Sequence, residues 1–163
     1  MDAAHVMILG IGSLLFSDDG FGIHVVNRLQ ELYEFPENVS VVDGGVLGLN
    51  LLGTISQADH LIVVDAVRNH GAPGSLYRLE GEAIPERVRA KNSLHQVDFL
   101  EALTMCRVLD KVPETVILGV EPQDVETFGL DLTPATRDRI EEMIDRILGE
   151  MDRLGVPYKK KEP

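Results

Sequence analysis

The stretch that decides the fold is residues 5–32, HVMILGIGSLLFSDDGFGIHVVNRLQEL. Its apolar run His5–Leu9 ends in glycines, which is typical of a short buried strand. Phe21–Leu32 carries apolar side chains at three- and four-residue spacing, and this spacing predicts a helix after the strand. A buried strand followed by a helix is the opening unit of an alternating α/β fold.

The same alternation continues along the chain. Further strands are predicted at Val39–Val42, His60–Val64 and Thr115–Val120, with an edge strand at Ser75–Leu79. Further helices are predicted at Leu47–Ile55, Leu94–Leu109 and Thr133 to about Leu154, with Thr133 as the cap and Pro134 in the first turn. We therefore expect one domain, residues 1–163, with a flexible tail at 156–163. Its fold would be a three-layer α/β/α sandwich of about five mostly parallel strands.

Composition narrows the classes of function. The net charge of −12 repels phosphate backbones, so nucleic acid is not an expected partner. No apolar run approaches the ~20 residues of a membrane-spanning helix, and the first residues lack the basic segment of a signal peptide. The single cysteine, Cys106, suits a reducing compartment. We expect a cytoplasmic protein that binds no membrane and is a monomer.

Acidic residues follow three of the predicted strands. Asp18 and Asp19 come after the first strand, Asp43 after the second and Asp65 after the third, while His95 opens a predicted helix. Ligands of such sheets bind beyond the carboxyl ends of the strands. Two carboxylates and one imidazole form a three-point site for Zn²⁺ or Ni²⁺ with positions left open. A metal held in this way polarises a peptide carbonyl or activates water.

Each residue also has a simpler interpretation. In this interpretation, an acid at position 18 or 19 would stabilise a helix N-terminus. Asp65 would cap a turn, and His95 would have no role as a ligand. The glycines of Gly10-Ile11-Gly12 also suggest a dinucleotide-binding loop, with Asp43 on the ribose. However, Leu15 occupies the place of the third glycine, and acids at the helix start oppose phosphate binding.

The ordered motifs resemble those of the hydrogenase maturation proteases. They are GIGSLLFSDDGFG at 10–22, DGGVLG at 43–48, DHLIVVDAV at 59–67, SLHQ at 93–96, and GVEP at 119–122 followed by Gly129 and LTP at 132–134. The resemblance implies an endopeptidase that removes the C-terminal extension of the nickel–iron hydrogenase large-subunit precursor after nickel insertion. It also implies a twisted sheet between helices, in agreement with the pattern above.

The resemblance assigns roles to four residues. Asp19, Asp65 and His95 match the family's metal-binding residues, and Asp43 matches a functionally important aspartate. Ser13 stands where many members have asparagine. The nickel would be carried by the substrate, with Zn²⁺ or another divalent ion as a substitute. Hydrolysis would use Asp43 or Asp19 as the general base beside that nickel, or an aspartate pair sharing a proton. The alternatives are a non-catalytic metal-binding maturation chaperone and a nucleotide-binding oxidoreductase.

Overall fold

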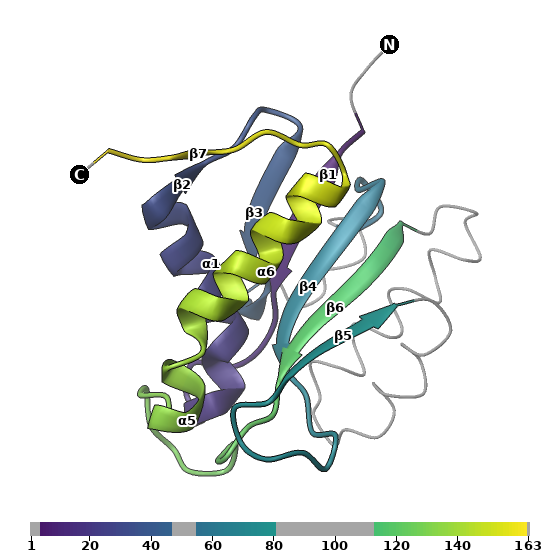
Figure 1. Cartoon of the computed structure of the whole chain (residues 1–163). Helices are drawn as coiled ribbons and strands as arrows, with labels where there is room; N and C mark the ends of the chain where they lie inside the picture. Colours follow the sequence, from purple (N-terminus) through teal and green to yellow (C-terminus); the bar gives the residue numbers. More distant parts are fainter. Residues whose placement is uncertain (1–3, 47–54, 81–112, 163) are drawn as a thin grey trace.

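A five-stranded sheet forms the centre of the computed structural model, which describes residues 4–46, 55–80 and 113–162. The strand order is β3-β1-β4-β6-β5 (Figure 1). Four strands are parallel, and β5 pairs antiparallel with β6 at one edge. The strands are β1 (Val6–Gly10), β3 (Val39–Asp43), β4 (His60–Ala66), β5 (Leu76–Glu80) and β6 (Glu114–Val120).

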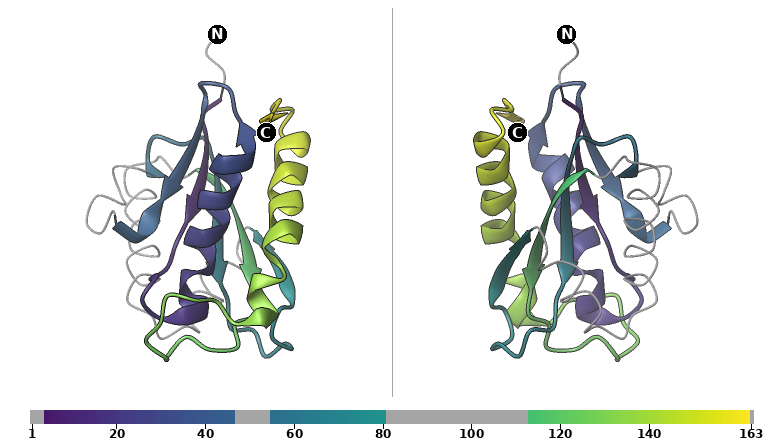
Figure 2. Two further views of the ribbon diagram at one scale, coloured as in Figure 1. Left: turned by 90° about the vertical axis from the view of Figure 1, so that its left-hand side faces the viewer. Right: turned by 90° about the vertical axis from the view of Figure 1, so that its right-hand side faces the viewer.

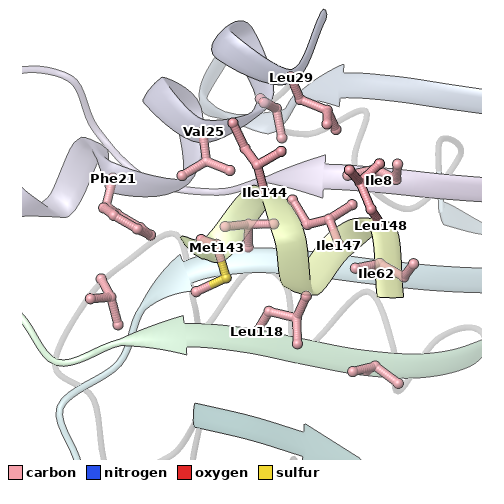
Figure 3. Packing of buried hydrophobic residues seen from close by; sticks show 14 of the residues in the cluster. Ile8, Phe21, Val25, Leu29, Ile62, Leu118, Met143, Ile144, Ile147 and Leu148 are labelled. Carbon is pink, nitrogen blue, oxygen red and sulfur yellow. The ribbon is translucent and has the colours of Figure 1, made fainter. Parts of the chain in front are cut away.

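Two helices cover one face of this sheet. Helices α1 (Phe21–Leu32) and α6 (Ile140–Arg153) lie beside each other along the strands (Figures 1 and 2). Their apolar side chains interlock over the sheet (Figure 3), and each fully buried one contributes about 1.5–3 kcal/mol. The cluster includes Phe21, Val25 and Leu29 of α1, Met143, Ile144, Ile147 and Leu148 of α6, and Ile8, Ile62 and Leu118 of the sheet.

The opposite face of the sheet carries a second core. Alternate residues of the same strands point there because successive side chains of a strand face opposite ways. Ile55 and Ala58 pack against this face. The strand residues of this core are Met7, Leu9, Leu61, Val63 and Ile117. The predicted α/β fold with five mostly parallel strands is confirmed. The helices predicted at 47–55 and 94–109 lie outside the described residues, apart from Ile55.

The prediction of one long C-terminal helix is wrong. Residues Pro134–Arg137 form a separate short helix, α5, before α6. The break follows from a change of hydrogen bonding, since the Arg139 N–H bonds to the Thr136 carbonyl three residues back, at 2.9 Å. Thr133 is the N-cap residue of α5 as predicted, but its side chain does not bond to the helix.

The end of the chain contains a short strand. Lys159–Lys160 forms strand β7, which pairs antiparallel with β2 (Tyr33–Glu34). The rings of Tyr33 and Tyr158 meet edge to face at 6.0 Å. Val156 and Tyr158 pack against the main core. The flexibility of residues 156–163 stays a prediction. Among the described helices, none has the length and apolar character to cross a bilayer.

Candidate active site at the carboxyl edge of the sheet

The loops that follow the parallel strands meet at one end of the sheet, the lower end in Figure 1. β1 leads into the 3-10 helix η1 (Ser17–Gly20), and β3 leads into η2 (Gly44–Val46). The segments 67–75 and 121–133 follow β4 and β6. The structure therefore places Asp19, Asp43 and Asp65 at the same edge, where ligands of parallel sheets bind.

Glycines let η1 pack closely against the loop after β1, and let the first turn of α1 pack closely against β4. Gly12 has a φ of +143°, and a Cβ there would lie 1.9 Å from the Asp19 carbonyl oxygen. A Cβ on Gly22 would lie 2.1 Å from the Val64 carbonyl oxygen. η1 also contacts β4, and in the loop between β1 and η1 the Ile11 N–H bonds to the Val64 carbonyl at 3.0 Å. The backbone of Asp19 is thereby held beside the strand that carries Asp65.

Asp19 organises the loop that precedes it. Its side chain is half-buried, and Oδ2 accepts a hydrogen bond from the Ser13 N–H at 3.0 Å. The Ser13 hydroxyl in turn accepts from the Leu15 N–H at 3.3 Å. Serine at position 13 therefore shapes the loop through its short hydroxyl, and its backbone orients the Asp19 carboxylate.

Asp65 is buried at the end of β4, with 5% of its surface exposed. Its Oδ1 accepts a hydrogen bond from the Ala66 N–H at 2.8 Å. By strand alternation, it shares a sheet face with Leu61 and Val63, opposite the face covered by α1 and α6. A carboxylate in such a place needs polar or cationic partners, because burial of an uncompensated charge is costly.

Asp43 lies at the end of β3, on the other side of β1 from Asp65. It pairs in register with Gly10, and its Oδ1 accepts a hydrogen bond from the Gly45 N–H at 2.9 Å. Alternation places it on the face of Val39 and Val41, which is the α1 side. The end of β1 therefore separates Asp43 from Asp65, so the two aspartates occupy the same edge but start from opposite faces.

The described residues hold only part of the predicted metal-binding set. Asp19 and Asp65 lie on contacting elements, whereas His95 falls outside the described residues. Within the described ranges, no three His, Cys, Asp or Glu side chains gather in a way that would hold a metal ion. The two carboxylates suit a divalent cation that also receives ligands from elsewhere.

Asp18 has a structural role that the sequence did not reveal. Its side chain is fully buried and accepts backbone hydrogen bonds from Gln123 (2.8 Å), Asp124 (3.0 Å) and Thr133 (2.8 Å). The hydroxyls of Thr133 and Thr136 also donate to it. Asp18 thus fastens η1 to the 121–133 segment and to the start of α5, and it is not available as a metal ligand.

The pKa of Asp18 reflects this setting. Burial alone raises the pKa of its carboxyl. The hydrogen bonds from the Thr136 hydroxyl and from the backbone of Thr133, Asp124 and Gln123 outweigh burial and lower the pKa below 3.8, its ordinary value. Asp18 is therefore an anion near neutral pH, and oriented N–H and O–H dipoles stabilise its charge.

Glu121 performs a similar task for the loop after Asp65. Its buried Oε1 accepts hydrogen bonds from the backbone of Asn69 (2.8 Å) and Gly71 (2.9 Å), and from the Tyr77 hydroxyl (2.7 Å). Burial raises the pKa of Tyr77, and the bond to Glu121 raises it further. The resemblance included Glu121 in a motif without giving it a role, and the structure shows it anchoring residues 69–71.

Comparison with known proteins identifies the family. A model of the hydrogenase maturation proteases matches residues 23–150. A hydrogenase 2 maturation protease of Escherichia coli is 33% identical over 153 residues, with 93% of each chain covered. The chain belongs to the hydrogenase maturation protease family. Hydrogenase expression/formation protein HoxM of Azotobacter vinelandii is 39% identical, covering 96% of this chain and 76% of that protein.

Solved structures of the hydrogenase maturation proteases have the same fold. The hydrogenase maturating endopeptidase HybD from E. coli superposes with a TM-score of 0.91 at 31% identity, covering 96% of this chain and 98% of that one. A [NiFe] hydrogenase maturation protease from Thermococcus kodakarensis has a TM-score of 0.73 at 22% identity, covering 90% and 98%. The second likeness is one of fold alone. The family predicted from the sequence motifs is confirmed.

Proposed function

We propose that this family member is an endopeptidase that removes the C-terminal extension of a nickel–iron hydrogenase large-subunit precursor. The observation that carries the proposal is a family match spanning most of the chain, joined to acidic residues at the ligand-binding edge of the sheet. The single cysteine and the acidic composition support a cytoplasmic monomer that binds neither membrane nor nucleic acid.

Nickel enters this proposal as part of the substrate. Asp19 and Asp65, on contacting elements, supply two carboxylates, and His95 supplies the imidazole that nickel also accepts. Three protein ligands leave coordination positions for groups of the precursor itself. A precursor that has received its nickel would bind through this set, and one without nickel would not. Zn²⁺ would occupy the same ligands in the absence of substrate.

Asp43 is the better candidate for the general base. Within the described residues, the Gly45 N–H is the one hydrogen-bond donor to its carboxylate, so Oδ2 can take a proton from water. Its position across β1 from Asp65 separates proton transfer from nickel binding. In the alternative mechanism, Asp19 is the base or shares a proton with a second aspartate.

The structure argues against the nucleotide-binding alternative. In a dinucleotide site, backbone N–H groups after the first strand bind the pyrophosphate. Here the Ser13 N–H donates to the Asp19 carboxylate, and the Asp19 carbonyl fills the space beside Gly12. The glycine loop is therefore occupied by the protein's own η1 segment.

Intact-mass analysis of nickel-loaded precursor tests the proposal. We expect the protease to shorten the precursor at one position near its C-terminus, and Asp19→Ala and His95→Ala to abolish this change. Glu37→Ala, an exposed acid before β3, is the matched control and should cleave normally. Binding of precursor without any mass change would favour the maturation chaperone. Normal trimming by both site variants would overturn the metal-reading role.

A further inference from the structure

Large apolar side chains are exposed on two loops beside the candidate active site. We call this surface the apolar rim. Among the described residues, the rim contains all of the large hydrophobic side chains that are exposed. Phe128 is 74% exposed, Leu130 64% and Leu15 48%. The rim consists of Leu14, Leu15 and Phe16 from the loop after β1, and Phe128 and Leu130 from the loop after β6.

Hydrogen bonds join the two loops of the rim. Phe16 and Gly129 form a parallel bridge, in which the Gly129 N–H bonds to the Leu15 carbonyl at 2.8 Å. The Ser17 N–H returns a bond to the Gly129 carbonyl at 2.9 Å. The rings of Phe16 and Phe128 meet edge to face, with centroids 6.1 Å apart. The apolar side chains are therefore held outward by a braced backbone.

Asp18 also joins the two loops of the rim. It lies two residues after Phe16, and its buried carboxylate binds Gln123, Asp124 and Thr133 in the partner loop. The rim cannot fold inward without breaking these buried bonds. A preorganised apolar surface loses little conformational entropy when a partner covers it, and such surfaces mark binding sites.

The position of the rim next to the candidate active site indicates which partner binds to it. Leu14, Leu15 and Phe16 lie between Ser13, whose N–H holds the Asp19 carboxylate, and Asp19 itself. A polypeptide bound at Asp19 would therefore lie close to them. Glu126 and Asp131 are exposed next to Phe128 and Leu130. The segments 4–27 and 121–133 contain no lysine or arginine, and the exposed Arg68 of a neighbouring loop acts on Asp124. The two loops of the rim therefore favour a partner with basic residues.

We propose that the apolar rim docks an apolar segment of the precursor polypeptide, flanked by basic residues, next to the bond that is cut. This inference rests on the proposed endopeptidase function. Docking there supplies binding energy away from the reacting atoms, so it lowers KM and contributes little to the chemical step. Phe128, the most exposed aromatic side chain, is the expected anchor.

Cleavage kinetics with nickel-loaded precursor test the rim. Phe128→Ser should raise KM about tenfold, which is the range of an aromatic interface anchor, with kcat within about twofold of wild type. Leu15→Ser and Leu130→Ser should raise KM less. Phe128→Leu should retain most of the affinity, because it keeps an apolar side chain. Glu37 is exposed just before β3, at the opposite end of the parallel strands. Glu37→Ser should therefore leave KM unchanged.

Two further measurements separate the possible failures. Precursor affinity by biolayer interferometry is measured whether or not cleavage occurs, so absence of cleavage by wild type refutes the proposed function alone. Equal affinity and equal KM for wild type and for Phe128→Ser, Leu15→Ser and Leu130→Ser would overturn the proposed role of the rim. Sedimentation velocity tests whether a second copy of this chain covers the rim instead. If wild type is a dimer and Phe128→Ser is a monomer, the rim serves self-association.

Discussion

Substitution of Asp18 by asparagine should destabilise the fold without touching the reacting groups. The carboxylate accepts three backbone N–H bonds and two hydroxyl bonds in a fully buried position. Asparagine keeps one acceptor oxygen but presents an NH₂ group where the second oxygen was. If this group faces Gln123 and Asp124, two buried amides lose their acceptor at about 2 kcal/mol each.

The expected loss in the free energy of unfolding is therefore about 4 kcal/mol. In urea, with a slope of about 2 kcal/mol per molar, the midpoint should fall by about 2 M. The melting temperature should fall by about 10 °C for a chain of this length. Circular dichroism with wild type and Asp18→Asn at pH 7 measures both quantities. The matched control is Asp19→Asn, which removes the same charge one residue away and should cost under about 1 kcal/mol.

The same pair of proteins gives a pH test. The pKa of Asp18 is lowered in the folded state, below the ordinary 3.8, so its ionisation stabilises the fold above that pH. This contribution is lost as the pH falls through the folded-state pKa. The gap between wild type and Asp18→Asn should be equal at pH 7 and pH 5 and smaller at pH 3. An unchanged midpoint at pH 7, or a gap that widens in acid, would refute the reasoning.

Four further substitutions test the site and its scaffold. Asp19→Asn should fold normally yet lower the processing rate at least a hundredfold, measured by intact mass; wild-type turnover would contradict its role as a ligand. Asp43→Asn should bind nickel-loaded precursor normally but lower kcat by 10²–10⁴-fold, as expected for loss of a general base; weaker binding with unchanged kcat would argue against that role. Gly22→Ala should lower the urea midpoint by about 1 M or more, because its Cβ meets the Val64 carbonyl. Gly149→Ala, in α6 with open space around its Cα, should raise stability by up to about 1 kcal/mol, and equal effects at the two glycines would refute the packing argument.

The sequence predicted the elements whose signal is local. The helix at Phe21–Leu32 was predicted with the bounds that the structure has, and the apolar strands were placed to within about two residues. These elements can be predicted without distant contacts, because the spacing of apolar residues within each segment indicates its structure and its buried face. The edge position of β5 was also predicted, from the turn before the strand and the alternation within it.

Features that depend on contacts far apart in the sequence were missed. Asp18 binds Thr133 and Thr136, more than a hundred residues away, and no local pattern distinguishes it from Asp19. These bonds of Asp18 also hold the start of α5, the short helix that is separate from α6. Leu14, Leu15 and Phe16 have the composition of a core segment, and only the pairing with Gly129 explains why they face outward.

Paired incubation of the protease with nickel-loaded and nickel-free large-subunit precursor tests the central claim most directly. The proposed function predicts one cut near the C-terminus of the loaded precursor, seen as a single loss of mass, and no change in the nickel-free form. Equal cleavage of both forms would contradict the reading of nickel by Asp19, Asp65 and His95. Absence of cleavage of either form would contradict the endopeptidase function itself.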